Sequence, residues 1–275
     1  LAIGQMLVSI IVGFGIFCCH YDYHSDARCR QEKDMAAALI IGAGDATGGA
    51  IARAFAREGL TACVNRRARN ADQLEALAQS IRDEGHEAKA YPGDARLEED
   101  VIAMVDAIER DVGPIEVAIF NIGANVNFSV LETTSQVYRK VWEMAAFAGF
   151  LMGREVAKRM VRRQSGTIIF TGATASLRGG KGYSAFSGAK GALRMLAQSM
   201  ARELGPHNIH VAQVVIDGGI DTAFIRGLRP DFDEAKASDK VLSPDAIAAA
   251  YVGLHEQHRS AWTHEMDLRP WAETF

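Results

Sequence analysis

Residues 42–49 form the first segment whose residue types could bind a ligand. They read GAGDATGG, follow the apolar run 37–41 and precede an apolar stretch with helical spacing. Glycines let a chain turn sharply and let a phosphate approach the backbone, and the N-terminus of a following helix attracts anions. This strand–turn–helix context predicts a dinucleotide site, with a plain structural turn as the alternative. The residues of this turn expected to bind the dinucleotide are Gly42, Gly44, Asp45, Thr47 and Gly48.

Two arginines follow the second predicted strand, which covers 60–65. An acidic residue at this place would accept a hydrogen bond from a ribose 2′-hydroxyl. The guanidiniums of Arg66 and Arg67 instead favour a 2′-phosphate. We therefore expect NADP (NADPH) as the cofactor, with NAD less favoured and a solvated basic turn as the alternative interpretation.

Two later turns carry residues suited to the rest of such a ligand. Asp94 and Ala95 follow the third predicted strand, where the carboxylate could accept a hydrogen bond from an adenine amino group. Asn121 and Gly123 follow the fourth, in a turn that can approach the ribose and the nicotinamide. We expect all four residues to line the same site.

Strand-like and helix-like segments alternate along the chain after residue 36. This alternation predicts an α/β fold, a Rossmann-like, doubly wound parallel sheet with helices on both faces and right-handed crossovers. Ligands bind at the carboxyl ends of such strands, where the residues above lie. The predicted strands are 37–41, 60–65, 88–91, 115–120, 166–171, 209–216 and a closing strand within 261–268. Helices are predicted after the glycine turn and over 71–83, 98–110, 135–163, 183–204 and 244–255, with a substrate lid over 223–241.

Composition limits the class of protein. The chain has 275 residues, 48% of them hydrophobic and 23% charged, with a net charge of −4, which suits one large α/β domain. This charge does not suggest a nucleic-acid partner. Three of the four cysteines precede the glycine turn, so no disulfide framework is expected, in agreement with a reducing, cytoplasmic location. The histidines form no metal-ligand cluster, and no metal site is predicted.

Residues 1–34 differ in character from the rest. The run 1–19 is apolar except for Gln5 and Ser9, and as a helix it would reach about 28 Å, close to the thickness of a bilayer core. The favoured interpretation is that translation begins at Met35 and that residues 1–34 are an upstream or poorly ordered extension. A membrane anchor is the alternative. The domain prediction is therefore an extension over 1–34 and one dinucleotide-binding oxidoreductase domain over 35–275.

Several motifs match one known pattern. Segment 41–48 (IGAGDATG) matches a T-G-x-x-x-G-x-G turn, with Ile for Thr and Ala46 for the middle glycine. Segment 120–123 (FNIG) matches an N-N-A-G turn, with Phe for the first Asn. On these motifs, residues 36 to about 255 resemble the short-chain dehydrogenase/reductase family.

The resemblance implies roles for residues later in the chain. Lys190 matches the family lysine, which binds the nicotinamide ribose. Ile220 and Thr222 match the segment whose Thr contacts the nicotinamide amide, although 215–219 (VIDGG) replaces the expected Pro-Gly turn. Family members commonly form dimers or tetramers through two long helices, here 135–163 and 183–204, so a homodimer or homotetramer is expected.

The catalytic pattern is incomplete. The family usually has Asn, Ser, Tyr and Lys, with the Tyr four residues before the Lys. In this sequence the Tyr position is Phe186, the Ser position is Ala173 and the Asn position is Ala146, and only Lys190 remains. Phe186 has no proton to give to the alkoxide that hydride transfer to a carbonyl produces.

Tyr183, seven residues before Lys190, is the best remaining acid. Both lie on the helix predicted over 183–204 and share one of its faces, about 10.5 Å apart along the axis, too far for direct contact but close enough to touch one cofactor–substrate assembly. The spacing resembles that of the divergent enoyl reductase branch of the family, in which a tyrosine stabilises an enolate oxygen. The structural alternative is an aromatic residue packed at a helix start. Thr171 and Thr174, which flank Ala173, are further candidates to bind a substrate oxygen.

The leading functional prediction is an NAD(P)-dependent oxidoreductase of short-chain type that acts on a small molecule. It would transfer hydride between the nicotinamide and a C=O/CH–OH or an activated C=C, with Lys190 and Tyr183 as the catalytic residues. The competing prediction is an NADP-binding sensor or partner subunit without turnover, favoured by the missing Asn, Ser and Tyr.

Overall fold

The computed structural model describes residues 36–273. The predicted extension over 1–34 and the predicted start at Met35 lie outside these residues. None of the helices within 36–273 is long and apolar enough to cross a membrane.

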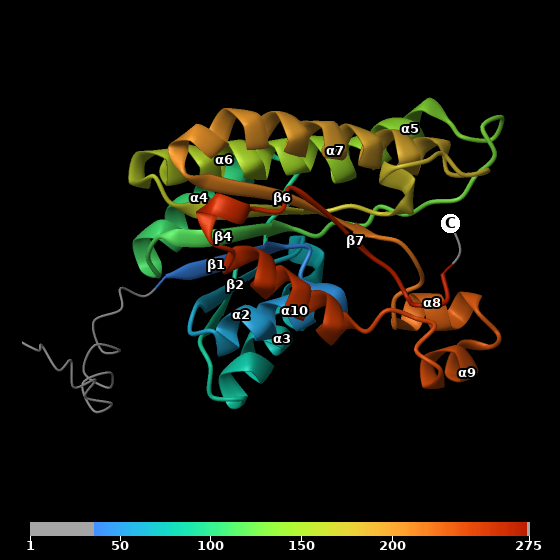
Figure 1. The fold of residues 1–275 in the computed structure, drawn as a ribbon, viewed down its shortest axis with the longest axis horizontal. Coiled ribbons are helices and arrows are strands. Elements are labelled where there is room, and N and C mark those ends of the chain that lie inside the picture. The colour runs from blue at the N-terminus through green and yellow to red at the C-terminus, as the bar shows by residue number, and fades with distance from the viewer. Residues whose placement is uncertain (1–35, 274–275) are drawn as a thin grey trace, which may run out of the picture. The chain divides into compact units, whose positions relative to one another are not determined.

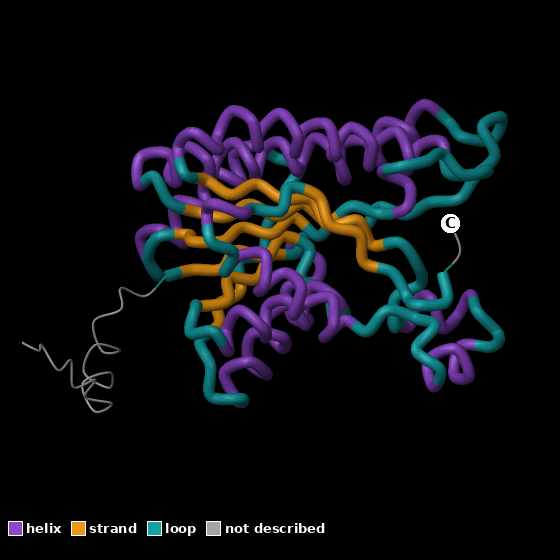
Figure 2. The backbone as a smooth tube through the Cα atoms, viewed as in Figure 1, coloured by secondary structure: helices purple, strands orange, loops and turns teal. Residues whose placement is uncertain are grey.

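A seven-stranded sheet forms the centre of the molecule (Figures 1 and 2). All neighbouring strands are parallel, in the order β3-β2-β1-β4-β5-β6-β7, so the chain winds outward in both directions from β1 and β4. This confirms the predicted doubly wound fold. The expected opening for a ligand is at the carboxyl ends of β1 and β4, from which the chain continues toward opposite edges of the sheet. The strands are β1 (Ala37–Ile41), β2 (Thr61–Asn65), β3 (Ala88–Ala90), β4 (Ile115–Phe120), β5 (Gly166–Thr171), β6 (Ile209–Ile216) and β7 (Glu265–Leu268).

Helices cover both faces of the sheet, as Figure 1 shows. Successive side chains of the buried strand β1 point to opposite faces of the sheet. Ala38 and Ile40 pack in the core beneath α2, α3 and α10. Leu39 and Ile41 pack in the core beneath α4, α6 and α7. Because both faces are buried, the strand reads as a continuous apolar run rather than an alternating one. These helices are α2 (Thr47–Arg57), α3 (Ala71–Asp83), α4 (Glu98–Asp111), α6 (Ala148–Arg163), α7 (Ser184–Leu204) and α10 (Pro244–His255).

The helix predicted over 135–163 has an irregular centre. It consists of α5 (Ser135–Trp142), a π-helical turn η3 (Glu143–Phe147) and α6. Thr134 caps its start, where the side-chain oxygen accepts a hydrogen bond from the Val137 amide. Turns of this kind are frequent at functional sites, and this one places Met144 beside a pocket described below.

The predicted lid over 223–241 forms two short helices, α8 (Ala223–Leu228) and α9 (Phe232–Ala237). Phe232, Ala235 and Val241 make a small core of their own, against which Ile225 packs. The lid is therefore a separately packed unit at the carboxyl end of the sheet. The closing strand is shorter than predicted, because Arg259–Ala261 forms a 3₁₀ turn before β7 begins.

A buried hydroxyl pair joins α10 to β5. Tyr251 is fully buried, and its hydroxyl lies 2.8 Å from the Thr171 hydroxyl oxygen. We predict that Tyr251→Phe lowers the free energy of unfolding by about 1–3 kcal/mol, because it leaves the Thr171 hydroxyl buried without a partner. Urea denaturation measures this. The double variant Tyr251→Phe with Thr171→Val should recover part of the loss, and a single variant as stable as the parent would contradict the prediction.

Candidate active site

Two adjoining hollows lie at the carboxyl ends of the strands. The first, here called the inner cavity, measures about 750 Å³ and is lined by residues of β5, α7, the β6–α8 connection and α8. The second, the outer pocket, measures about 340 Å³ and lies over the ends of β1, β2 and β3. Asn121, Ile122 and Gly123 line both, so an extended ligand can pass from one to the other.

The glycine turn is fixed by close backbone contacts. Gly42 has φ +86°, and a Cβ atom there would lie 2.7 Å from the Asn121 carbonyl oxygen. A Cβ atom at Gly48 would lie 2.5 Å from the Gly42 carbonyl oxygen. Gly44 has no atom within 4 Å of its Cβ position and lines the outer pocket. Gly42 and Gly48 are thus required by packing, and Gly44 leaves the backbone open to a ligand.

Arginines surround the outer pocket. The two predicted from the sequence, Arg66 and Arg67, line it, and so do Arg69 and Arg96. Sequence reasoning missed Arg69 because a 3₁₀ turn over Ala68–Asn70 returns it to the pocket, which the residue spacing does not reveal.

Only some of these guanidiniums are neutralised. Arg96 pairs with Asp94, and Arg66 lies 3.5 Å from Asp45. Among residues 36–273, neither Arg67 nor Arg69 has a carboxylate partner. Burial, followed by the charges of Arg69 and Arg96, lowers the pKa of Arg67. An anion bound here would relieve this repulsion.

Asp94 lines the outer pocket, as does Ala95. Both carboxylate oxygens of Asp94 accept hydrogen bonds from the Arg96 side chain, and this pairing lowers the pKa of Asp94. The adenine-binding role of Asp94 stays a prediction, and in the structure its oxygens orient Arg96. Asp45 and Gly48, also predicted to bind, line neither hollow: Asp45 is exposed and Gly48 is packed inside the turn.

Lys190 lies at the floor of the inner cavity. Its side chain is 1% exposed, and its Nζ donates hydrogen bonds to the carbonyl oxygens of Ile122 at 2.8 Å and Thr171 at 2.7 Å. An ammonium group has three N–H donors, so one remains for a ligand. Burial lowers the pKa of Lys190 to about 7. The ammonium therefore ties the ends of β4 and β5 together beneath the cavity.

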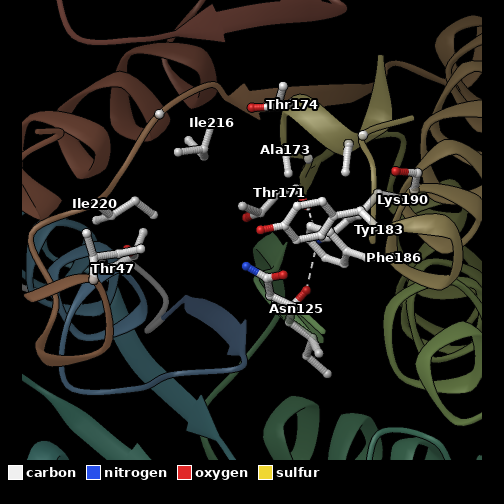
Figure 3. A pocket seen from close by; sticks show the side chains of 18 of the residues that line it. Thr47, Asn125, Thr171, Ala173, Thr174, Tyr183, Phe186, Lys190, Ile216 and Ile220 are labelled. Carbon is white, nitrogen blue, oxygen red and sulfur yellow. Dashed lines mark hydrogen bonds between the residues drawn. The ribbon is translucent and has the colours of Figure 1, made fainter. Parts of the chain in front are cut away.

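Tyr183 and Asn125 point into the inner cavity (Figure 3). Tyr183 is the N-cap of α7 and not part of the helix, because Gly182, with φ +83°, turns the chain just before the helix begins. The prediction that the Tyr183 and Lys190 side chains share one helix face was therefore wrong in detail, although both line the cavity. Phe186 packs beside Tyr183, with ring centroids 6.5 Å apart. Asn125 was not among the residues predicted from the sequence, because its spacing from the other candidate residues matches no motif.

The remaining sequence candidates also have positions in the inner cavity. Thr47, Ile220 and Thr222 line it. Thr171 and Thr174 line it too, but their hydroxyls have partners in the protein, Tyr251 and Asp217 respectively. The alanines at 173 and 146 leave no hydroxyl or amide where the family pattern has Ser and Asn. No group of three or more His, Cys, Asp or Glu residues suited to a metal ion occurs among residues 36–273.

Comparisons with known proteins identify the family. Residues 36–232 match the family described as short chain dehydrogenase. The 2-dehydro-3-deoxy-D-gluconate 5-dehydrogenase of Formosa agariphila is 32% identical over 174 residues, which span 63% of this chain and 66% of that protein.

Two solved structures are similar. A short-chain dehydrogenase from Rhodopseudomonas palustris is 47% identical, with a TM-score of 0.74, covering 86% of this chain and 99% of that one. A variant of actinorhodin polyketide ketoreductase with NADPH shares the fold, with a TM-score of 0.78 and 21% identity over 86% of this chain and 97% of that one. With the sheet order, the glycine turn and the buried lysine described above, these matches show that the chain belongs to the short-chain dehydrogenase/reductase family of NAD(P)-dependent oxidoreductases.

Proposed function

We propose that this protein is an NADPH-dependent reductase, or the reverse dehydrogenase, that acts on a small C=O/CH–OH or activated C=C substrate. The observation that carries the proposal is the continuity of the two hollows. An arginine-lined outer pocket leads, past Asn121 and Gly123, to the Lys190 ammonium and the Tyr183 hydroxyl. A dinucleotide needs cations at one end and hydrogen-bond donors for a ribose at the other, and this path supplies both.

The phosphate end of the cofactor would be held by residues of the outer pocket. Gly44 and Gly123 have open space where a side chain would stand, which leaves backbone accessible to the pyrophosphate and the ribose. Arg67 and Arg69, free of carboxylate partners within residues 36–273, would bind a 2′-phosphate. This charge favours NADPH over NADH.

Tyr183 would act as the proton donor. The bound cofactor supplies the hydride, and negative charge then develops on the substrate oxygen, which needs a donor nearby. Phe186 cannot be this donor, because its side chain carries no hydroxyl group. The Tyr183 hydroxyl and the Asn125 amide both point into the cavity and could bind that oxygen (Figure 3). Lys190 would hold the nicotinamide ribose with its free N–H.

A second function, a cofactor-binding sensor without turnover, has one specific argument in its favour. Phe186, Ala173 and Ala146 together remove three groups that reductases of this family use. The buried charge of Lys190 argues for a bound ligand under both functions, because an ammonium without a carboxylate partner destabilises the folded state.

Assembly through the helices of one sheet face is part of the proposal. Trp142 on α5, Phe150 on α6 and Met195 on α7 are large apolar side chains that are 38–52% exposed. Contact with a second copy of the chain would cover them, which supports a homodimer or homotetramer.

Turnover separates the two functions. We expect the protein to oxidise NADPH with at least one member of a panel of ketones, oxo acids and enoyl thioesters. We expect Tyr183→Phe to lower kcat by about 100-fold or more, with NADPH affinity unchanged. Tyr138→Phe, on exposed α5 and outside the cavity, is the matched control. Tight NADPH binding without turnover on any compound would favour the sensor.

Cofactor choice can be tested at Arg67. We predict that Arg67→Gln weakens NADPH binding by roughly 10- to 100-fold, because it removes a charge-assisted contact to the 2′-phosphate. NADH binding should change by less than about threefold. Fluorescence titration of both nucleotides measures this, with Arg162→Gln, exposed on α6, as the control. Equal losses for NADPH and NADH would refute a 2′-phosphate role.

Lys190 should give the protein a distinctive pH dependence. Its pKa is about 7 in the folded state and 10.5 ordinarily, so between these values the unfolded chain binds the proton and the folded one does not. Raising the pH through this window therefore stabilises the fold, by up to about 1.4 kcal/mol per pH unit. We predict that the unfolding free energy of the parent minus that of Lys190→Met increases from pH 7 to pH 9.5 in denaturant titrations. If the unfolding free energies of the two proteins changed equally with pH, the prediction would be wrong.

A further inference from the structure

The charges that line the inner cavity are few and of one sign. Among the described residues that line it, only Lys190 and Arg178 are charged, and no carboxylate lines it. Lys190 is buried and already donates to two carbonyl groups. Arg178 is therefore the accessible cation of the cavity.

Arg178 is only weakly neutralised by the protein. Its side chain is 52% exposed, and its nearest carboxylate, that of Asp217, is 4.0 Å away, at the limit of an ion pair. Asp217 has closer ties elsewhere: it accepts a hydrogen bond from Thr174 at 2.5 Å and lies 3.8 Å from the Arg269 guanidinium. Within residues 36–273 no acceptor bonds the Arg178 guanidinium at hydrogen-bond distance.

The loop that carries Arg178 also carries the proposed proton donor. Residues 177–182 connect the 3₁₀ turn Thr174–Ser176 to Tyr183 at the start of α7. The loop is anchored where the Phe128 amide donates to the Gly182 carbonyl at 2.8 Å, and where the Tyr183 amide donates to the Gly180 carbonyl at 3.1 Å. A guanidinium and a phenol thus stand on one short, fixed segment at the edge of the cavity.

Six of the described residues that line the inner cavity carry hydroxyl groups, and the protein itself binds three of these hydroxyls. The hydroxyls of Thr47, Tyr183 and Ser187 remain for a ligand, and that of Ser187 is buried. Thr171 pairs with Tyr251, Thr174 donates to Asp217, and Thr222 accepts from the Ile225 amide. Much of the remaining wall is apolar, formed by Ala173, Phe186, Ile216, Ile220, Phe224 and Ile225. Such a wall suits a hydrocarbon body better than a chain of hydroxyls, which would lose hydrogen bonds to water on entry.

Resting on the proposed function, we propose that Arg178 selects the substrate. The substrate class is a small acid with one carboxylate, which Arg178 binds, and an apolar body, which holds the reacting carbon near Tyr183. This differs from the hydroxylated acid for which the similar enzyme of Formosa agariphila is named.

Binding tests this without requiring turnover. Hexanoate, its neutral analogue hexanamide, and gluconate are titrated calorimetrically into the full chain, with and without NADP⁺, at low ionic strength. We expect hexanoate to bind about tenfold or more tightly than either hexanamide or gluconate, because a guanidinium–carboxylate contact is worth at least one factor of ten. Arg178→Met should reduce the preference over hexanamide to less than about threefold, while hexanamide affinity stays the same.

Two variants serve as controls. Lys181→Met removes a positive charge from the same loop, but Lys181 is exposed and does not line the cavity, so the preference should persist. Arg178→Lys keeps the charge and should keep part of the preference. Equal binding of hexanoate and hexanamide, survival of the preference in Arg178→Met, gluconate binding as tightly as hexanoate, or no binding of hexanoate and hexanamide would each overturn the proposal. Failure of NADP⁺ to bind would instead contradict the proposed function, since the anion preference is also read without it.

Discussion

The contact on which the site depends is the one between the Lys190 ammonium and two backbone carbonyls. Ile122 follows β4 and Thr171 ends β5, so a single side chain from α7 joins two strands and a helix at the carboxyl edge of the sheet. Full burial makes this charge costly, and the cost appears as a pKa lowered to about 7. Hydrophobic packing alone would place an apolar residue there. The two carbonyl groups hold the ammonium in place and leave its third N–H for a ligand.

An aromatic ring, that of Phe186, lies beside the same ammonium. Its centroid is 5.9 Å from Nζ. Tyr183, the proposed proton donor, is the N-cap of α7 and so stands at the end of a loop and not on a turn of the helix. The position of the proposed proton donor thus depends on the path of a loop, whereas the outer pocket is formed over the ends of β1, β2 and β3.

Much of the fold could be predicted from the sequence, because the bounds of most strands depend on residues within the strand and directly next to it. Strands β4, β5 and β6 have the predicted bounds because each is an apolar run interrupted at both ends by glycine, asparagine or another turn residue. The π-helical turn Glu143–Phe147 was not predictable, since hydrophobic periodicity is nearly the same in α and π geometry over five residues. Most of the predicted cofactor residues line one of the two hollows because they follow strand ends, and the carboxyl ends of the strands share one edge of the sheet. Arg69, Asn125 and Arg178 were missed because they lie on loops whose paths depend on tertiary contacts, as with the bond from Phe128 to Gly182.

The C-terminal segment packs against the connection between β6 and α8, where Gly218 lines the inner cavity. Arg269, just after β7, lies 3.8 Å from the buried Asp217, and Pro270 packs so closely that a Cβ atom at Gly218 would lie 2.7 Å from its Cδ. The match to the family pattern ends at residue 232, well before this segment. Arg178 and Tyr183 lie within the matched residues, so the described part of the segment after β7 acts on the cavity through its contacts with Asp217 and Gly218. A substitution in this segment can therefore shift the backbone at Gly218, and with it the wall of the inner cavity, without contact to the turns that follow β1, β2 and β3.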